Sequence, residues 1–385
     1  MNPSRGVKSG AGLLLCALGL ACSSGSGRGA VSEYRPPDLA RLQSALEIAP
    51  GFELGSREIP WAMGIDPIVF GDGRAISFED PAQKEDEYTS PVFDCAPFDE
   101  CLVSWNARHS KATGFGVEIS VARAADQTFS PWMWIGEWNV SARPKELALE
   151  FEDAKIDVDT FTSRSTWSAV RLRVRVRASE SGQLRFALER LSIVPTLRAE
   201  HAVSIASTGK TLAISARLAV PFRSQRVEAP ALASRICSPT SLSMVLAYRG
   251  VDVPTSEVAR RAYDPFHDIY GNWNRAIQTA CSFGVPGRLE RIHDWHRAEE
   301  LLAKGQPLIL SIAAKAGQLH GAPYASTAGH LLVLCGFDEA SRALVNDPAA
   351  DTASAGQTAY SRDDLETVWM KRGGTAYVLE ASHRP

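Results

Sequence analysis

The sequence has no excess of either charge and lacks the patterns of several functional classes. It holds 41 lysines and arginines against 44 aspartates and glutamates, which gives a formal net charge of −3. A basic tail, a zinc finger and a phosphate-binding glycine loop are all absent, so nothing indicates nucleic-acid binding. Histidines and cysteines do not occur together at zinc-ligand spacing, and we expect neither a metal nor another cofactor. No internal repeat is evident.

The apolar run at residues 11–21 is too short to be a permanent membrane span. It follows two basic residues and leads through small residues into Cys22, which predicts a secretory signal peptide over residues 1–22. Its end resembles a bacterial lipoprotein box, which implies that Cys22 becomes the lipidated first residue after cleavage. The glycine- and serine-rich residues 23–30 then predict a flexible tether. We therefore expect an exported protein that is lipid-anchored to a membrane of the cell envelope, with ordinary secretion as the alternative.

The seven cysteines divide by their place in the chain, and two of them belong to the predicted signal peptide. Cys95 and Cys101 bracket a short loop between extended segments, which predicts a disulfide in an oxidising compartment. Cys281, on an expected helix, and Cys335, on an expected strand, are interpreted as buried thiols. The remaining cysteine, Cys237, lies in a different kind of segment.

The sequence pattern changes near residue 200, which predicts two domains. Residues 31–200 are rich in segments that alternate with period two, and this is typical of an antiparallel β-sandwich. Residues 201–219 either link the domains or add a final strand to the sandwich. Residues 220–385 change to helices with clear stops, alternating with strands, so the predicted fold class is α+β with a papain-like second domain. We expect helices at residues 256–263, 273–283, 295–304 and 361–370, and strands at residues 307–314, 329–337, 343–347 and 375–380.

Two features of the first domain allow a binding role. Trp132 and Trp134 share one strand face by parity and could stack on sugars, although tryptophans more often fill a core. Every second position over residues 171–177 is an arginine. This stripe is either a solvated outer face or an attachment site for anionic cell-wall or surface polymers.

Residues 235–246 place one thiol at the start of a predicted helix. Pro239 suits the first helical turn, Ser238 can cap it, and apolar residues follow at helical spacing. The unpaired amides and the positive end of the helix dipole favour a thiolate at Cys237. Because a thiolate attacks carbonyl carbons, Cys237 is a candidate nucleophile.

Other segments supply a base, an orienting acid and an oxyanion donor. Residues 329–338 predict a buried strand that opens on His330, and residues 343–348 contain the return strand of a hairpin. Such a hairpin brings Asp347 to the level of His330, where its carboxylate can bond the imidazole as in a catalytic triad. Gln225 ends an extended segment and is a candidate oxyanion donor alongside the backbone amide of Cys237.

These residues resemble a known family, the C39-like cysteine peptidases of the papain clan. The resemblance implies that Cys237 is the nucleophile, His330 the general base, Asp347 the orienting acid and Gln225 the oxyanion-hole residue. It also implies a hydrolase that cleaves amide bonds in a peptide, a protein or a cell-wall component, and the first domain resembles jelly-roll accessory modules. The resemblance is carried by six ordered blocks, at residues 220–225, 237–241, 270–273, 282–284, 329–330 and 346–348.

One departure from the family pattern keeps other functions open. Ser238 stands where the family usually has glycine, and a side chain there matters if the position needs a positive φ or close substrate approach. One alternative is therefore a surface binding protein, for a polysaccharide or a protein, whose peptidase-like domain is inactive. Another is a peptidoglycan amidase or an acyl transferase on the same fold. Taken singly, Cys237 could be structural, His330 a strand-end histidine and Asp347 a turn opener.

Overall fold

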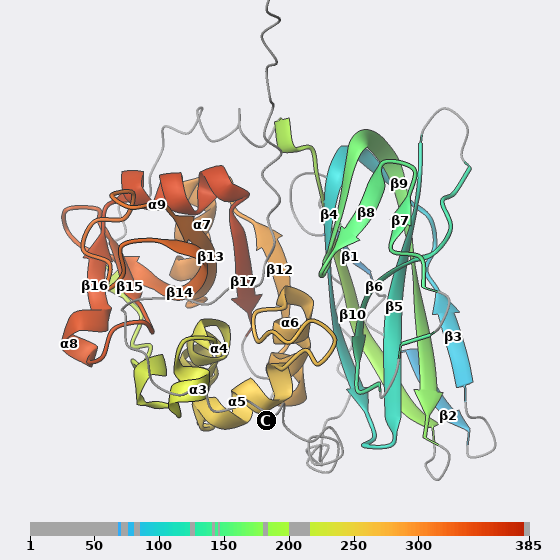
Figure 1. The fold of residues 1–385 in the computed structure, drawn as a ribbon, viewed down its shortest axis with the longest axis horizontal. Coiled ribbons are helices and arrows are strands. Elements are labelled where there is room, and N and C mark those ends of the chain that lie inside the picture. Colours follow the sequence, from blue (N-terminus) through green and yellow to red (C-terminus); the bar gives the residue numbers. More distant parts are fainter. Residues whose placement is uncertain are drawn as a thin grey trace, which may run out of the picture.

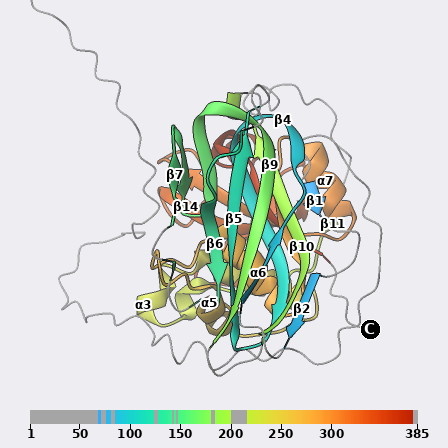
Figure 2. The same ribbon diagram turned by 90° about the vertical axis from the view of Figure 1, so that its right-hand side faces the viewer.

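The computed structural model describes residues 68–70, 76–80, 85–123, 128–140, 143–144, 147–179, 184–199 and 216–380. The predicted signal peptide, Cys22 and the tether lie outside the described residues. Within these ranges, no helix is long and apolar enough to cross a membrane. Two β-sheets lie side by side, one made of strands alone and one accompanied by helices, as Figure 1 and, from the side, Figure 2 show. We call residues 68–199 the N-terminal module and residues 216–380 the C-terminal module.

The N-terminal module is one ten-stranded sheet whose named strands all pair antiparallel, in the order β1-β10-β4-β9-β5-β6 with the others off this path. The long strands β4 and β9 each pair with several neighbours, and the sheet encloses one apolar cluster that includes Trp105, Phe115 and Trp167. The strands are β1 (Ile68–Phe70), β2 (Ile76–Asp80), β3 (Glu85–Thr89), β4 (Phe93–His109), β5 (Thr113–Ala122), β6 (Met133–Trp138), β7 (Glu150–Phe151), β8 (Ala154–Asp157), β9 (Thr160–Ala178) and β10 (Leu184–Thr196).

The predicted alternation of β9 is present. Its valines and Leu172 are buried, whereas the arginines that alternate with them over residues 171–177 are partly or fully exposed. Arg173 forms an ion pair with Glu118 at 2.7 Å, and Arg171 and Arg173 both stack against the ring of Trp132. Trp134 is only 4% exposed. Of the two tryptophans that the sequence suggested for sugars, Trp132 is thus covered by guanidinium groups and Trp134 is buried.

The C-terminal module is a seven-stranded antiparallel sheet with helices on both faces (Figure 1). Its order is β12-β17-β13-β14-β15-β16, with β11 paired to β14. The strands are β11 (Ala216–Arg217), β12 (Gly287–Arg291), β13 (Leu308–Ala314), β14 (Thr327–Phe337), β15 (Ala343–Asn346), β16 (Gln357–Tyr360) and β17 (Thr375–Leu379). The helices are α3 (Pro230–Ala233), α4 (Cys237–Tyr248), α5 (Thr255–Ala262), α6 (Trp273–Ser282), α7 (Trp295–Ala303), α8 (Ala353–Gly356) and α9 (Arg362–Val368), with the 3-10 turns η2 (Gln225–Val227) and η3 (Met370–Arg372).

Alternation along the strands of this sheet explains why both faces are covered. Leu308, Leu310 and Ile312 of β13 pack with α7 and α9, while Ile309 between them packs with α4 and α6. Every expected helix and strand of this module is present within a residue or two of its predicted bounds. The molecule is therefore a mixed fold built on antiparallel sheets with few helices, as the α+β prediction required.

Cys95 and Cys101 are both free thiols. Irregular pairing interrupts β4 between Asp94 and Glu100, and burial raises the pKa of Cys95 to about 11 and that of Cys101 well above its usual value. The predicted disulfide is thus not formed in this structure. The two thiols are nevertheless close enough for the charge of Cys95 to raise the pKa of Cys101 further.

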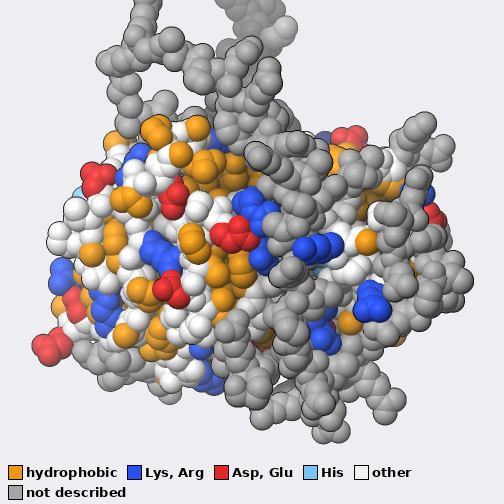
Figure 3. All heavy atoms as spheres, turned by 90° about the horizontal axis from the view of Figure 1, so that it is seen from below, with side chains coloured by type: hydrophobic (Ala, Val, Ile, Leu, Met, Phe, Trp, Pro, Cys, Tyr) orange, Lys and Arg blue, Asp and Glu red, His pale blue; other side chains and the backbone are white. Residues whose placement is uncertain are grey.

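The two modules share a buried interface. Leu102 and Val194 of the N-terminal module belong to the same apolar cluster as residues of α4 and α6. The Gln278 side chain accepts from Ala107 N at 3.0 Å and donates to Ala107 O at 2.8 Å, so that α6 extends the hydrogen bonding of β4. On the part of the described surface that Figure 3 shows, neither positive nor negative side chains gather into one patch.

Candidate active site

Cys237 is the first residue of α4, as the sequence predicts. Ile236 precedes the helix with φ −115° and no side-chain cap, so the expectation that Ser238 caps it is wrong. Ser238 lies inside the helix, is 1% exposed, and its hydroxyl is 3.2 Å from the hydroxyl of Tyr377. Cys237 itself is a partly exposed residue, and it is a free cysteine.

Helix α4 packs directly on strand β14, which carries His330. The apolar face formed by Leu242, Val245 and Leu246 is fully buried, and the Ser241 hydroxyl donates to Leu331 O at 3.0 Å. This packing places the Cys237 thiol in hydrogen-bond contact with the His330 side chain.

The predicted hairpin brings Asp347 to His330. Strands β14 and β15 pair antiparallel, and Asp347 follows directly after β15. His330 Nε2 is 2.8 Å from Asp347 Oδ1, and these side chains are 3% and 0% exposed. Because Asp347 occupies Nε2, the other ring nitrogen, Nδ1, is the one that remains for the thiol.

The three side chains favour a charged pair. Burial lowers the pKa of His330, but the Asp347 carboxylate outweighs it and the pKa is raised overall. Burial alone would raise the pKa of Cys237, yet hydrogen bonds and charge from His330, together with the amides of Leu331 and Ser238, hold it below its ordinary value. The pKa of Asp347 is likewise lowered despite burial, chiefly by His330. The arrangement therefore supports a thiolate facing an imidazolium.

Two tyrosines that the sequence did not single out complete the surroundings of Asp347. Tyr324 and Tyr360 donate their hydroxyls to Asp347 Oδ2 at 3.0 and 2.9 Å, and Ala349 N donates to Oδ1 at 3.0 Å. The Tyr324 ring also packs edge-on against the His330 ring at 5.0 Å. No local pattern marks either tyrosine, because Tyr324 comes from a loop and Tyr360 from a strand that only the fold brings beside β15.

Gln225 lies next to the segment that follows Asp347. Its backbone N donates to Pro348 O at 2.9 Å, and its side-chain Nε2 donates to Ala233 O at 2.7 Å. Its Oε1 is buried and has no hydrogen-bond partner among the described residues. The structure thus brings Gln225 to the Asp347 loop, while one proton of its amide is used by Ala233.

The other described cysteines do not share these properties. Cys281 and Cys335 are buried, and burial raises the pKa of Cys335 to about 12 and that of Cys281 further. Over the described ranges, no group of three or more histidine, cysteine, aspartate or glutamate side chains could hold a metal ion. Among the described cysteines, Cys237 thus differs in that its pKa is lowered.

Both parts of the chain match known domain families. The model of the Peptidase_C39 like family matches residues 217–377, and the model of the Peptidase C39 N-terminal domain matches residues 66–195. A search of curated proteins gave no match. Among solved structures, a candidate C39-like peptidase from Bacillus anthracis is 18% identical, with a TM-score of 0.33, over 43% of this chain and 97% of that one. A structure of the infectious bursal disease virus Gt strain is 14% identical, with a TM-score of 0.16, over 38% of this chain and 41% of that one. The chain thus carries a domain that matches the peptidase C39-like family, with a domain that matches the C39 N-terminal domain ahead of it.

Proposed function

We propose that this protein is a cysteine hydrolase, and more narrowly a peptidase. The observation that carries the proposal is the contact of Cys237 with His330, whose other nitrogen lies 2.8 Å from the buried Asp347. The Cys237 thiolate attacks the carbonyl carbon of an amide and forms a tetrahedral adduct. His330 then gives its proton to the leaving amine, which departs and leaves a thioester. Water, deprotonated by His330, attacks the thioester, and release of the acid restores the thiol.

The oxyanion of the tetrahedral adduct needs donors. Backbone amides at the start of α4 supply some of them, because the first amides of a helix have no partner within it. Gln225 is proposed as the side-chain donor through the second proton of its Nε2, since the first is donated to Ala233. This role requires Gln225 Nε2 to lie within hydrogen-bond distance of the oxygen of the carbonyl that Cys237 attacks.

The geometry of Ser238 favours an active enzyme over a degenerate one. Ser238 lies in a helical segment, so the position does not use a positive φ. Its side chain is directed to Tyr377 in the interior and does not fill the space beside the thiol. The surface-binding alternative was based mainly on Ser238, so it is no longer favoured. An amidase or acyl transferase would use the same three residues, Cys237, His330 and Asp347.

We further propose the architecture and location that the sequence suggests. The C-terminal module is interpreted as papain-like, with the nucleophile on a helix and the base and acid on the facing sheet, and the N-terminal module as a jelly-roll-like accessory domain. The division near residues 200–220, the signal peptide, the Cys22 lipid anchor and export to the cell envelope are part of this proposal. Its substrate would be a peptide, a protein or a peptide bond of the cell wall.

The deciding test is the pH dependence of iodoacetamide labelling at Cys237 in the full-length protein, with His330→Ala as the comparison. We expect a Cys237 rate that levels off well below the free-thiol pKa of about 8.5, and that falls in His330→Ala. Cys281 and Cys335 serve as internal reference thiols by mass mapping. If Cys237 titrates like an ordinary thiol in both proteins, the hydrolase proposal fails and a binding protein is favoured. Mass analysis of peptides and peptidoglycan fragments after incubation then separates peptidase, amidase and transferase.

A further inference from the structure

A strained turn of the N-terminal module reaches the C-terminal module. Strands β8 and β9 are joined through Val158 and Asp159, and Asp159 N donates to Asp157 O at 2.8 Å. Val158, between them, has a φ of 59°, a left-handed backbone conformation that is strained for a β-branched residue. Strain of this kind persists where the surroundings fix the conformation, and here it fixes the carboxylate of Asp159.

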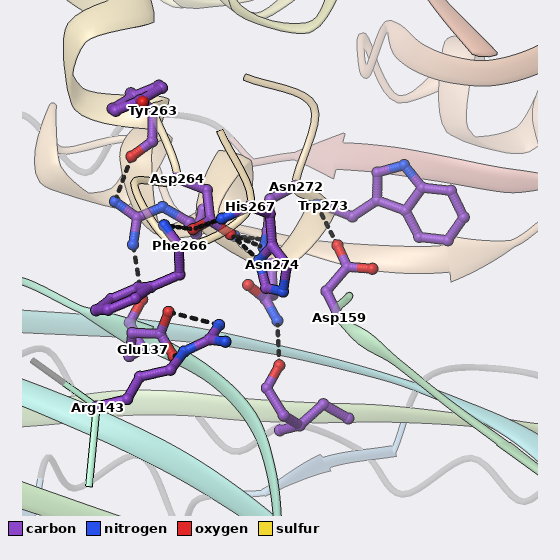
Figure 4. A network of polar contacts seen from close by, with 12 residues as sticks. Glu137, Arg143, Asp159, Tyr263, Asp264, Phe266, His267, Asn272, Trp273 and Asn274 are labelled. Carbon is purple, nitrogen blue, oxygen red and sulfur yellow. Dashed lines mark hydrogen bonds and ion pairs between the residues drawn. The ribbon is translucent and has the colours of Figure 1, made fainter. Parts of the chain in front are cut away.

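That carboxylate caps a helix of the other module. Asp159 is 5% exposed, and its Oδ2 accepts from Trp273 N, the first amide of α6, while its Oδ1 accepts from the Thr160 hydroxyl at 3.2 Å. The α6 start also has a cap of its own, since Asn272 Oδ1 accepts from Arg275 N at 3.1 Å. Figure 4 shows Asp159 reaching Trp273 from the opposite module. The start of α6 is thus held by one acceptor from each module.

The same network holds the loop before α6. Arg275 donates to Glu137 O at 2.9 Å in the N-terminal module and to Tyr263 O at 2.7 Å in its own. Asp264 accepts from Asn272 Nδ2 and from His267 Nδ1, both at 2.8 Å. Figure 4 shows these groups, with Arg143 over the Phe266 ring, as one continuous network between the modules. The loop of residues 263–272 is therefore held in place by contacts with the N-terminal module.

This loop in turn contacts both residues that precede the nucleophile. Arg235 forms an ion pair with Asp268 at 2.8 Å, and Ile236 is buried in one apolar cluster with Tyr263 and Tyr270.

A second route reaches the residue after the nucleophile. The hydroxyl of Tyr377 contacts that of Ser238, and Tyr377 is buried in one apolar cluster with Ala276 and Ile277 of α6, the helix that Asp159 caps. The residues before and after Cys237 thus contact the 263–272 loop and Tyr377, and both of these pack beside the α6 start that Asp159 caps.

We propose that Asp159 is a positioning residue for Cys237, and that the N-terminal module completes the active site instead of serving as a detachable substrate-binding domain. The proposal rests on the proposed function, because it needs Cys237 to be a reactive thiol. Asp159 does not touch the reacting atoms; it acts through the start of α6, the 263–272 loop and Tyr377.

The test compares full-length wild type with Asp159→Ala, Asp159→Asn and Asp159→Glu by iodoacetamide labelling of Cys237 from pH 5 to 9. Asp159→Ala removes the acceptor, and we expect the Cys237 rate at pH 7 to fall on the order of 10-fold and its apparent pKa to rise. Asp159→Asn keeps an acceptor oxygen and should restore most of the rate. Asp159→Glu keeps the charge but moves the carboxylate by one methylene, and should show the raised Cys237 pKa even if Asp159→Ala does not fold.

Asp153→Ala is the matched control. Asp153 lies in the neighbouring β7–β8 turn and accepts hydrogen bonds from Ser163 and Ser165 of its own module. We expect it to leave the Cys237 profile unchanged. A loss of thermal stability in Asp159→Ala and Asp159→Glu with an unchanged Cys237 profile would mean a structural role alone and would overturn the proposal. If wild-type Cys237 itself shows no lowered pKa, the proposed function has failed first, and the wild-type curve identifies that case.

Discussion

Asp347 is a buried carboxylate, and both of its oxygens accept hydrogen bonds. It is 0% exposed and accepts from the His330 ring, Ala349 N and the hydroxyls of Tyr324 and Tyr360. An ion buried this deeply is stable only when it is paired and hydrogen-bonded. The tyrosines therefore do more than fill space, because they help to keep Asp347 ionised, and an ionised Asp347 keeps His330 charged.

Removing one of these hydroxyl donors should shift the pH below which Cys237 loses its reactivity. The Tyr360 hydroxyl is among the groups that lower the pKa of Asp347, after the larger effect of His330. In Tyr360→Phe the pKa of Asp347 rises, so Asp347 is protonated at a higher pH and the thiolate–imidazolium pair is lost there. We expect the low-pH edge of the Cys237 labelling curve to shift to higher pH, with a stability loss of about 1 kcal/mol.

Tyr248→Phe is the control, because Tyr248 ends α4 and stacks with Arg249, away from Asp347. It should leave the edge in place. An unchanged edge in Tyr360→Phe as well would show that this hydroxyl does not tune the pair.

At this scale the sequence predicted the residues that lie on regular elements. Cys237 was predicted from the start of a helix. His330 and Asp347 were predicted from the two strands of one hairpin, because their separation in sequence brings them to the same level of the hairpin. Tyr324 and Tyr360 were missed because they approach from a loop and a neighbouring strand. Gln225 was predicted in the right neighbourhood, but the sequence could not indicate that Ala233 takes part of its amide.

Among the elements, helix α8 constrains the segment after Asp347. Asp347 N donates to Gly356 O at 2.9 Å, and a Cβ at Gly356 would come within 2.1 Å of the Phe222 ring and 2.9 Å of Asp347 O. Gly356→Ala should therefore force Phe222 or the Asp347 backbone to move. We expect a loss of about 1–3 kcal/mol in urea unfolding and slower Cys237 labelling.

Gly271→Ala provides the comparison, since a Cβ there meets nothing within 4 Å. It should be close to neutral in both measurements. Equal stability of the two variants would show that the segment after Asp347 is looser than the structure indicates.

The elements that the sequence missed are those stabilised by distant partners. Strand β12 carries Arg288, Glu290 and Arg291, a composition that does not predict a buried strand. In the fold Arg288 pairs with Glu290 and with Glu380, and Arg291 pairs with Glu100 of the N-terminal module. Charged residues are buried here because ion pairs neutralise them, and the partners Glu380 and Glu100 lie too far along the chain for a local pattern to predict them.

At the scale of the whole molecule, the docking of the modules was the least predictable feature. Asn106 donates to Gly287 O at 2.7 Å and accepts from Gly287 N at 2.8 Å, which mirrors the pairing of Gln278 with Ala107. Such amide side chains satisfy backbone groups of the opposite module within a buried interface. In the sequence, Asn106 and Gln278 cannot be told from other polar residues on a strand or helix. Only the assembled fold shows that they join the modules.

This interface buries an acid, and its stability should depend on pH. Burial raises the pKa of Asp159 to about 6 from an ordinary value of 3.8. Because the folded-state pKa is raised, ionised Asp159 opposes folding above about pH 6, and this cost disappears below the unfolded pKa near 4. Asp159→Asn lacks the charge, so its stability relative to wild type should increase between pH 4 and pH 6 and then level off, by about 3 kcal/mol.

Urea unfolding of the full-length proteins at several pH values measures this difference, and Asp153→Asn supplies a control of opposite sign. The pKa of Asp153 is lowered, mainly by the Ser165 hydroxyl, so its ionised form favours folding at higher pH. Asp153→Asn should therefore lose stability relative to wild type as the pH rises through the acid range. If Asp159→Asn follows the same direction as Asp153→Asn, the Asp159 carboxylate is not desolvated, and the closed interface between the modules is not the state of the protein in solution.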